Sequence, residues 1–196
     1  DPEVAKLADT MDTIRSLGQF DIIICTDGSA EGDMHCGGSA AVVFSGQVDH
    51  MVEVAVRRQR GAAFTSSFET EVCALVLGLE WLALNSRGGR FLVCSDSRSA
   101  LAAMEGGSFH SHQHLGEVEQ ALRRVSGEVV FQWVPGHSGF VGNERADQEA
   151  RMATTLPTGA GDSEAQPRVP VSYRAARSWI FHEVRDPPIA HARARQ

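Results

Sequence analysis

Two aspartates stand directly after apolar segments of the sequence. Asp27 follows IIICT and Asp96 follows FLVCS, and each opens a turn of small residues. The C-terminal ends of neighbouring parallel strands meet at one edge of a sheet, so these two carboxylates can lie close together. Carboxylates crowded in this way repel each other unless a cation lies between them. The pair therefore indicates a metal site, and a strand that ends in an ordinary Asp-Gly-Ser turn is the alternative interpretation of Asp27 taken alone.

A third carboxylate belongs to the long segment that begins at Ser66. Ser66 and Glu69 match a capping box, in which the glutamate hydrogen-bonds back to the cap residue, so Glu69 has a structural role. Glu71 instead heads an apolar stripe at helical spacing, which faces the sheet. The stripe continues through Ala74, Leu75, Gly78, Leu79 and Leu82. Because a buried glutamate is costly unless it is paired or coordinating, Glu71 is the better candidate for chemistry.

The fourth carboxylate lies near the end of GHSGFVGNERAD. Asp147 falls in the first turn of a predicted helix, where the helix dipole alone would favour an acid. His137 lies in the glycine-bearing loop just before it, and a solvated loop histidine is the alternative to a catalytic one. The four acids and this histidine form the candidate site.

The elements that must position these residues follow from hydrophobic periodicity. Apolar runs predict strands at residues 21–26, about 38–45 and about 48–56, which form an antiparallel meander. The period then changes to 3.6, which predicts helices over about 66–85, 97–105, 114–125 and 143–155, with strands at 91–96 and 128–134 between them. We therefore expect an α/β fold with a five-stranded mixed sheet, three antiparallel strands followed by two parallel ones, and helices on both faces.

Composition places the chain among globular proteins. The 196 residues are 42% hydrophobic and 22% charged, with no run of about 18 apolar residues that could span a membrane. The net charge is −7, and the segment from Arg168 to Gln196 carries +4, which leaves −11 on the preceding residues. An acidic body does not predict a tight, unaided nucleic-acid binder. The four cysteines are far apart, with no CxxC pair, which favours a reducing, intracellular location, nuclear or cytoplasmic, and no zinc site.

Composition also divides the chain. Residues 1–19 begin with Asp rather than Met, so we expect an N-terminal extension or a linker from an upstream domain. Residues 20–155 form the main domain, 156–170 are a Pro/Gly-rich flexible linker, and 171–196 form a basic C-terminal helical extension. The histidines of FHSHQH, at positions 110, 112 and 114, are interpreted as a solvated loop rather than a metal site.

Taken together, the motifs resemble type-1 ribonuclease H. The resemblance rests on TDGS around Asp27, on Glu71 with Ala74 and LE behind it, on SDS around Asp96, and on HSG followed by GNERAD at His137 and Asp147. It runs from about Asp21 to Thr155, and all four carboxylates fall in the family's order. The same elements then imply a ribonuclease-H-like fold.

The resemblance implies a ribonuclease H that cuts the RNA strand of RNA/DNA hybrids. Asp27, Glu71, Asp96 and Asp147 would hold two Mg²⁺ ions, with Mn²⁺ as a candidate substitute, and His137 would assist proton transfer or product release. Hard oxygen ligands suit Mg²⁺, and two ions can clamp the attacking and leaving oxygens. The substrate contacts are assigned to Gly28, Ser29, Ser66 and Ser67. Serine stands at the last two positions, where the family often carries asparagine.

Two features of the sequence indicate which subgroup of the family it is similar to. The stretch between Asp96 and His137 lacks a Lys/Arg/Trp-rich substrate-binding helix, and FQWVPGHSGFVGNERAD with the distal PVSYRAARSWIFHEVRDPP is similar to non-LTR retrotransposon polyproteins. That similarity implies a reverse transcriptase domain in the same polyprotein as a partner. A free-standing cellular ribonuclease H is the alternative within the class. An inactive scaffold or binding domain is the alternative from another class, against which the intact acidic quartet argues.

Overall fold

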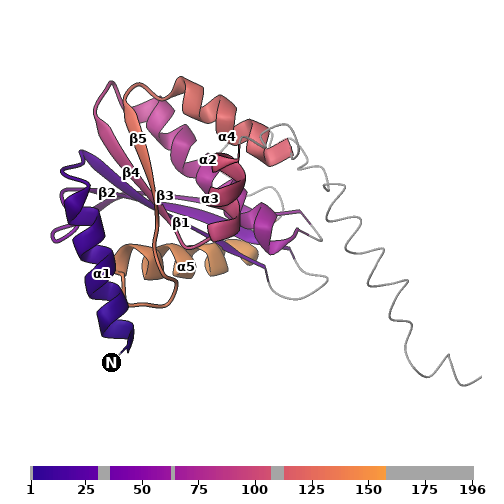
Figure 1. Cartoon of the computed structure of the whole chain (residues 1–196). Coiled ribbons are helices and arrows are strands. Elements are labelled where there is room, and N and C mark those ends of the chain that lie inside the picture. Colours follow the sequence, from indigo (N-terminus) through magenta and orange to yellow (C-terminus); the bar gives the residue numbers. More distant parts are fainter. Residues whose placement is uncertain (1, 31–35, 63–64, 107–112, 158–196) are drawn as a thin grey trace, which may run out of the picture.

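The computed structural model describes residues 2–30, 36–62, 65–106 and 113–157 as one five-stranded mixed sheet with helices (Figure 1). Strands β1 (Ile22–Ser29), β2 (Gly38–Ser45) and β3 (Val52–Arg60) form an antiparallel meander. Strands β4 (Arg90–Ser95) and β5 (Glu128–Trp133) then add in parallel on the other side of β1. The order β3-β2-β1-β4-β5 confirms the predicted architecture and makes β1 the central strand.

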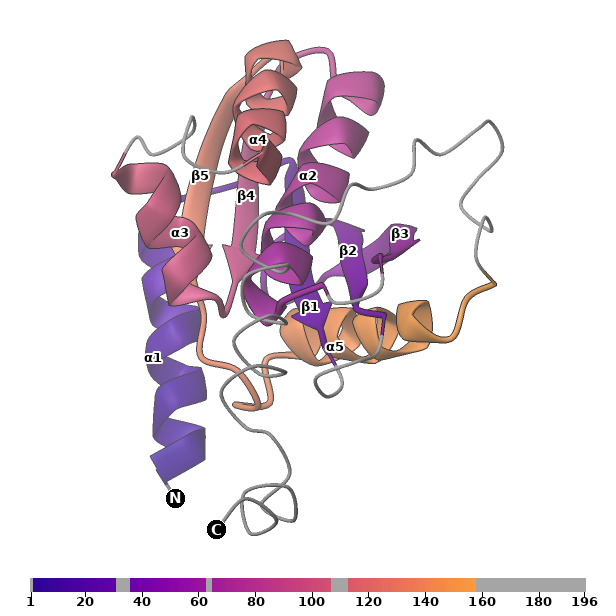
Figure 2. The ribbon, with the colours of Figure 1, turned by 90° about the vertical axis from the view of Figure 1, so that its right-hand side faces the viewer.

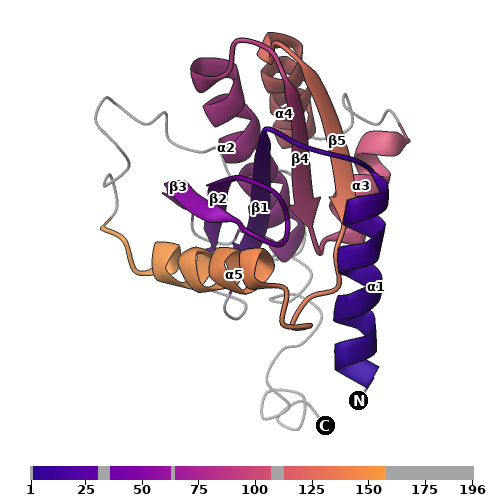
Figure 3. The ribbon, with the colours of Figure 1, turned by 90° about the vertical axis from the view of Figure 1, so that its left-hand side faces the viewer.

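Helices cover both faces of the sheet, as predicted (Figures 2 and 3). On one face, α2 (Ser67–Asn85), α3 (Arg98–Glu105) and α4 (Gln113–Arg124) enclose an apolar cluster with alternate residues of the strands. On the other face, α1 (Pro2–Ser16) and α5 (Val141–Thr154) enclose a second cluster. No helix within the described ranges is long and apolar enough to cross a bilayer. The four cysteines are free thiols.

The predicted third strand is displaced in the structure. β3 runs from Val52 to Arg60 rather than over residues 48–56, because Gly46, with φ of +92°, begins a wider turn whose residue His50 donates its amide to the carbonyl of Gln47. The arginine-rich end of the segment, residues 57–60, is part of the strand because it pairs with β2 at the edge of the sheet. Arg58 pairs with the buried Glu149 of α5, which satisfies both charges. The polar residues 57–60 therefore fell outside the predicted range, although they continue this edge strand.

The interpretation of the FHSHQH histidines is wrong for His114. This residue is 4% exposed at the start of α4, where its Nδ1 lies 3.0 Å from a carboxylate oxygen of Glu117. Its other partner is Cys73 of α2, and hydrogen bonding to Cys73 and then Glu117 raises the pKa of His114 to about 10. His110 and His112 lie outside the described residues, as do the predicted linker from residue 158 onward and the helical extension over 171–196.

Replacing His114 by Gln should flatten the dependence of stability on pH. A histidine whose pKa is raised from 6.5 to about 10 stabilises the fold fully below pH 6.5, and that contribution is lost as the pH rises through about 10. Urea unfolding across this window should show the wild type losing up to about 5 kcal/mol more than the variant, since a rise from 6.5 to about 10 is about 3.5 pKa units. Identical slopes for the two proteins would contradict the buried imidazolium.

Candidate active site

The register of two parallel strands places Asp27 beside Asp96. Thr26 of β1 is paired directly with Ser95 of β4, and the Thr26 hydroxyl donates to the carbonyl of Cys94 over 3.2 Å. The two aspartates are the next residues along each strand, so they emerge at the same edge of the sheet. Asp27 is only 6% exposed. The strand-end pattern therefore brings these two acids together as the sequence predicts.

The first turn of α2 places Glu71 over the same edge. The predicted capping box is confirmed: the Ser66 hydroxyl accepts from the Glu69 amide, and the Glu69 carboxylate accepts from the Ser66 amide. With its start fixed in this way, α2 turns Glu71 toward β1. Gly28 allows the approach, because a Cβ at this position would overlap the backbone nitrogen of Glu71.

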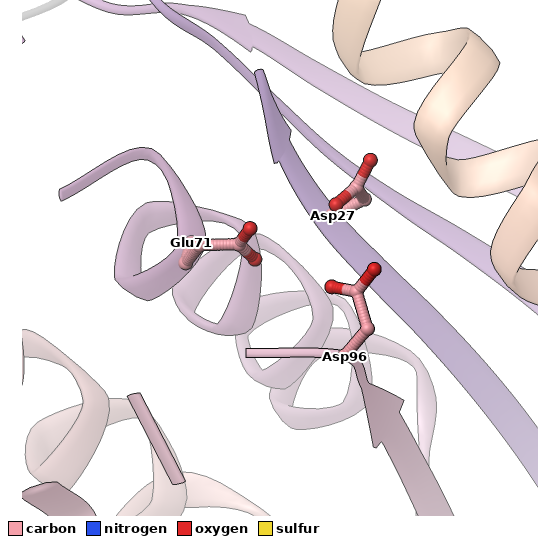
Figure 4. A group of neighbouring side chains, drawn as sticks. All are labelled: Asp27, Glu71 and Asp96. Atoms are coloured by element: carbon pink, nitrogen blue, oxygen red, sulfur yellow. The ribbon is translucent and has the colours of Figure 1, made fainter. Parts of the chain in front are cut away.

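Three carboxylates converge on one point. Asp27, Glu71 and Asp96 each offer an oxygen, and these oxygens all lie within 4.8 Å of one another (Figure 4). Asp147 of α5 adjoins the group, because both its charge and its role as a hydrogen-bond acceptor for protonated Asp27 raise the pKa of Asp27. On its other side, Asp147 makes an ion pair of 3.0 Å with Arg151, one helical turn along. All four predicted acids thus occupy one region.

Crowding and burial raise the pKa values of Asp27 and Glu71. Burial, followed by the charges of Asp96 and Asp147, raises the pKa of Asp27 to about 8. Burial, followed by the charges of Asp27 and Asp96, raises the pKa of Glu71 to about 9. At an effective dielectric constant of about 20, two such charges repel by roughly 3 kcal/mol. A full set of negative charges at neutral pH therefore requires a bound cation.

The chemistry of the donors fits a hard divalent cation. The cluster offers only carboxylate oxygens, with no thiolate or imidazole among them. Glu71 Oε2 is buried without a hydrogen-bond partner, and so is Asn143 Oδ1 on α5. Buried polar atoms are normally satisfied, so these two oxygens indicate room for a bound group beside the acids.

Asn143 and Trp133 are supports that the sequence analysis did not assign. The Asn143 amide donates to Asp96 Oδ2 over 3.3 Å, and the Trp133 indole donates to the backbone carbonyl of Asp96 over 3.0 Å. Arg98 then stacks on Trp133, with its guanidinium carbon 3.9 Å from the ring centroid. The buried Asn143 lies four residues before Asp147, on the same helix face, and that spacing was the available signal.

His137 lies in the loop between β5 and α5, exposed to solvent. Its φ of +51° is left-handed, which is unusual for a residue other than glycine. The loop reaches the carboxylate cluster at Gly136, since a Cβ there would overlap Asp96 Oδ2. The predicted histidine is therefore one residue from direct contact with the acids.

The four residues assigned to the substrate surround the start of α2. Gly28 and Ser29 end β1 and are half-buried. The hydroxyl of Ser66 is already engaged with Glu69, while Ser67 is exposed. Ser29 and Ser67 are at least partly exposed to solvent, whereas the hydroxyl of Ser66 caps the helix.

Comparisons with known proteins show which family and fold this chain is similar to. A family model described as RNase H matches residues 19–155. The Ribonuclease H of Syntrophomonas wolfei is 32% identical over 148 residues, which are 68% of this chain and 95% of that protein. The N-terminal RNase H domain of a Mycobacterium tuberculosis protein has a TM-score of 0.55 at 21% identity and covers 69% of this chain and 94% of its own. LC11-RNase H1 in complex with RNA/DNA hybrid also has a TM-score of 0.55 at 21% identity, covering 68% and 96%.

Without metal, Asp27→Asn should stabilise the protein at alkaline pH. A carboxyl whose pKa is raised from 3.8 to about 8 contributes stability below pH 3.8 that is lost as the pH rises through about 8. Urea unfolding in EDTA should show a gain for the variant of up to about 6 kcal/mol above pH 8, since a rise from 3.8 to about 8 is about four pKa units and each corresponds to about 1.4 kcal/mol. Millimolar Mg²⁺ should narrow the difference. Parallel pH profiles in EDTA would contradict the crowded cluster.

Proposed function

Because this chain belongs to the RNase H family, we propose that it hydrolyses the RNA strand of RNA/DNA hybrids by two-metal-ion catalysis. The family and its curated relatives identify the enzyme as a ribonuclease H. The observation that carries the finer proposal is the convergence of Asp27, Glu71 and Asp96 within 4.8 Å, with Asp147 beside Asp27. Such a site can hold divalent cations, and these would also offset the repulsion between the carboxylates and the anionic phosphodiester of a substrate.

The proposed roles divide between the acids and the histidine. Asp27 lies at the centre, since it interacts with Glu71, Asp96 and Asp147. When bound, a pair of Mg²⁺ ions supplies an activated water and stabilises the departing 3′ oxygen. Glu71 offers its unpartnered Oε2 as a ligand, and Asn143 fixes the orientation of the Asp96 carboxylate.

Hydrolysis transfers the water oxygen to phosphorus and breaks the bond from phosphorus to the 3′ oxygen. The products are a 5′-phosphate and a 3′-hydroxyl, so the leaving oxygen must gain a proton. His137, exposed beside the cluster, can deliver it or assist product release. Its loss should slow the reaction without abolishing it.

Selection of RNA requires a contact with the 2′-hydroxyl, the group that distinguishes it from DNA. We assign this contact to the end of β1, where the backbone of Gly28 and Ser29 borders the acids. Ser66 and Ser67 border the other side, and the exposed hydroxyl of Ser67 can reach a second strand. LC11-RNase H1, which has a similar fold, is in complex with an RNA/DNA hybrid, and this supports a hybrid as the substrate class.

We further propose that the domain over residues 20–155 acts during retrotransposon reverse transcription, inside the cell. Residues 1–19 would then join it to a reverse transcriptase, and residues 156–170 would link it to the basic extension over 171–196. The acidic body supports this proposal, because it favours delivery by a neighbouring domain over unaided binding. A free-standing cellular ribonuclease H is the second candidate, favoured by the 95% coverage of the Syntrophomonas wolfei protein.

Asp96→Asn should abolish Mg²⁺-dependent cleavage and leave the fold intact. Loss of one ligand charge should lower the rate by at least about a hundredfold, because metal catalysis supplies several kcal/mol and each 1.36 kcal/mol is tenfold. The assay uses a hybrid with each strand labelled in turn, with Mg²⁺ or EDTA, and circular dichroism checks the fold. The matched control is Glu105→Gln, an exposed acid at the end of α3.

Each outcome of this assay separates the candidates. Cleavage of the RNA strand by the wild type and the control, but not by Asp96→Asn, supports the proposed mechanism. Full activity of Asp96→Asn would overturn the site assignment. Absence of cutting by the folded wild type with either Mg²⁺ or Mn²⁺ would favour the inactive scaffold.

A further inference from the structure

Helix α1 lies outside the segment that the family model matches, which begins at residue 19. It is nevertheless packed into the protein, with Ile14 1% exposed and Thr10 7% exposed. Its C-terminal end is held by polar contacts, since Arg90 donates to the carbonyl of Leu17 and Arg15 pairs with Asp49 at 2.6 Å. The helix is therefore part of the folded unit.

The apolar face of α1 packs against both ends of the His137 loop. Val134 and Phe140 flank this loop, are almost fully buried, and share one apolar cluster with Ile14. Leu7 packs against the same cluster, and it lies near Gly139, where an added Cβ would be 3.6 Å from its Cδ2 atom, an ordinary van der Waals distance. The ribbon views agree, because α1 runs beside the connection from β5 to α5 in both (Figures 2 and 3).

The loop is therefore held on two sides. At Gly136 it abuts the carboxylate of Asp96, and at its two ends Val134 and Phe140 belong to the apolar cluster against which Leu7 of α1 packs. His137 lies between these contacts in a left-handed conformation, and Gly139 is left-handed as well, with φ of +81°. Glycine adopts this conformation freely, but a non-glycine residue such as His137 keeps it only where its surroundings fix it. One of the two surroundings here is the helix that the family match does not include.

We propose that α1 positions the catalytic loop, with Leu7 as the positioning residue that packs against the apolar cluster at the two ends of the loop and thereby sets where His137 points. Leu7 touches no reacting group, so it acts through His137, and this role rests on the proposed function of that histidine. The helix is thus a working part of the active site of this chain, although it lies next to the loop rather than next to the acids.

The test is Leu7→Ala in the full chain, with Leu7→Val as a milder variant. Hydrogen exchange of the backbone amides should become about tenfold faster over residues 136–140, because apolar packing by Leu7 that restrains the loop is lost. The matched control is Lys6→Ala, an exposed neighbour on the same helix, which should leave the loop unchanged. Unaltered exchange in both Leu7 variants would overturn the proposal.

A double-mutant cycle tests the link to His137. Leu7→Ala should lower kcat by about tenfold, part of the ~10²–10⁴ that a positioned proton donor supplies. Combined with His137→Ala, it should lower kcat no further than His137→Ala alone, because both changes act on one group. Additive losses would show that Leu7 does not act through His137.

The two readouts separate failure of this inference from failure of the proposed function. Calorimetry should give the same Mg²⁺ affinity for Leu7→Ala and the wild type, since Leu7 is not among the residues that could hold the ion. If the wild type cleaves no hybrid, the proposed function fails, and the exchange of residues 136–140 still decides whether α1 holds the loop. A changed Mg²⁺ affinity would show a general disturbance of the site and overturn the specific role of Leu7.

Discussion

Mutual repulsion among buried carboxylates is the constraint on which the rest of the structure depends. Asp27, Glu71 and Asp96 lie closer than solvated acids would, and burial combined with their charges raises the pKa values of the first two far above normal. The acids cannot move apart, because β1 and β4 are locked in register and an apolar cluster covers each face of the sheet. The fold therefore favours the binding of a cation at the C-terminal ends of β1 and β4.

Each neighbouring element serves that arrangement in a different way. The capping box fixes the first turn of α2, and Gly28 lets β1 approach it. Helix α5 contributes twice from one face, since Asn143 orients Asp96 while Asp147 approaches Asp27. A side chain at position 28 would overlap the backbone of α2, and position 143 carries an amide that donates a hydrogen bond to Asp96. The site is therefore built from the ends of elements, where backbone geometry is most tightly specified.

Features set by local sequence patterns could be predicted from the sequence. Features set by contacts between distant segments could not. Acids at strand ends, the capping box and the sheet-facing stripe of Glu71 are local signals, and each led to the correct element. The displaced β3 depends on a pairing between Arg58 and Glu149, and the burial of His114 depends on Cys73, so neither is visible in a window of sequence. The packing of α1 against the His137 loop is likewise a tertiary contact, for which a weakly amphipathic N-terminal segment gave no signal.

The most direct test of the carboxylate site is anomalous diffraction from crystals of the protein grown with Mn²⁺ and an uncleavable RNA/DNA hybrid. The account predicts two manganese peaks at the edge of the sheet, one of them ligated jointly by Asp27, Glu71 and Asp96 and the other reaching Asp147. Well-ordered carboxylates with no anomalous peak among them, at a Mn²⁺ concentration that supports hybrid cleavage, would contradict it.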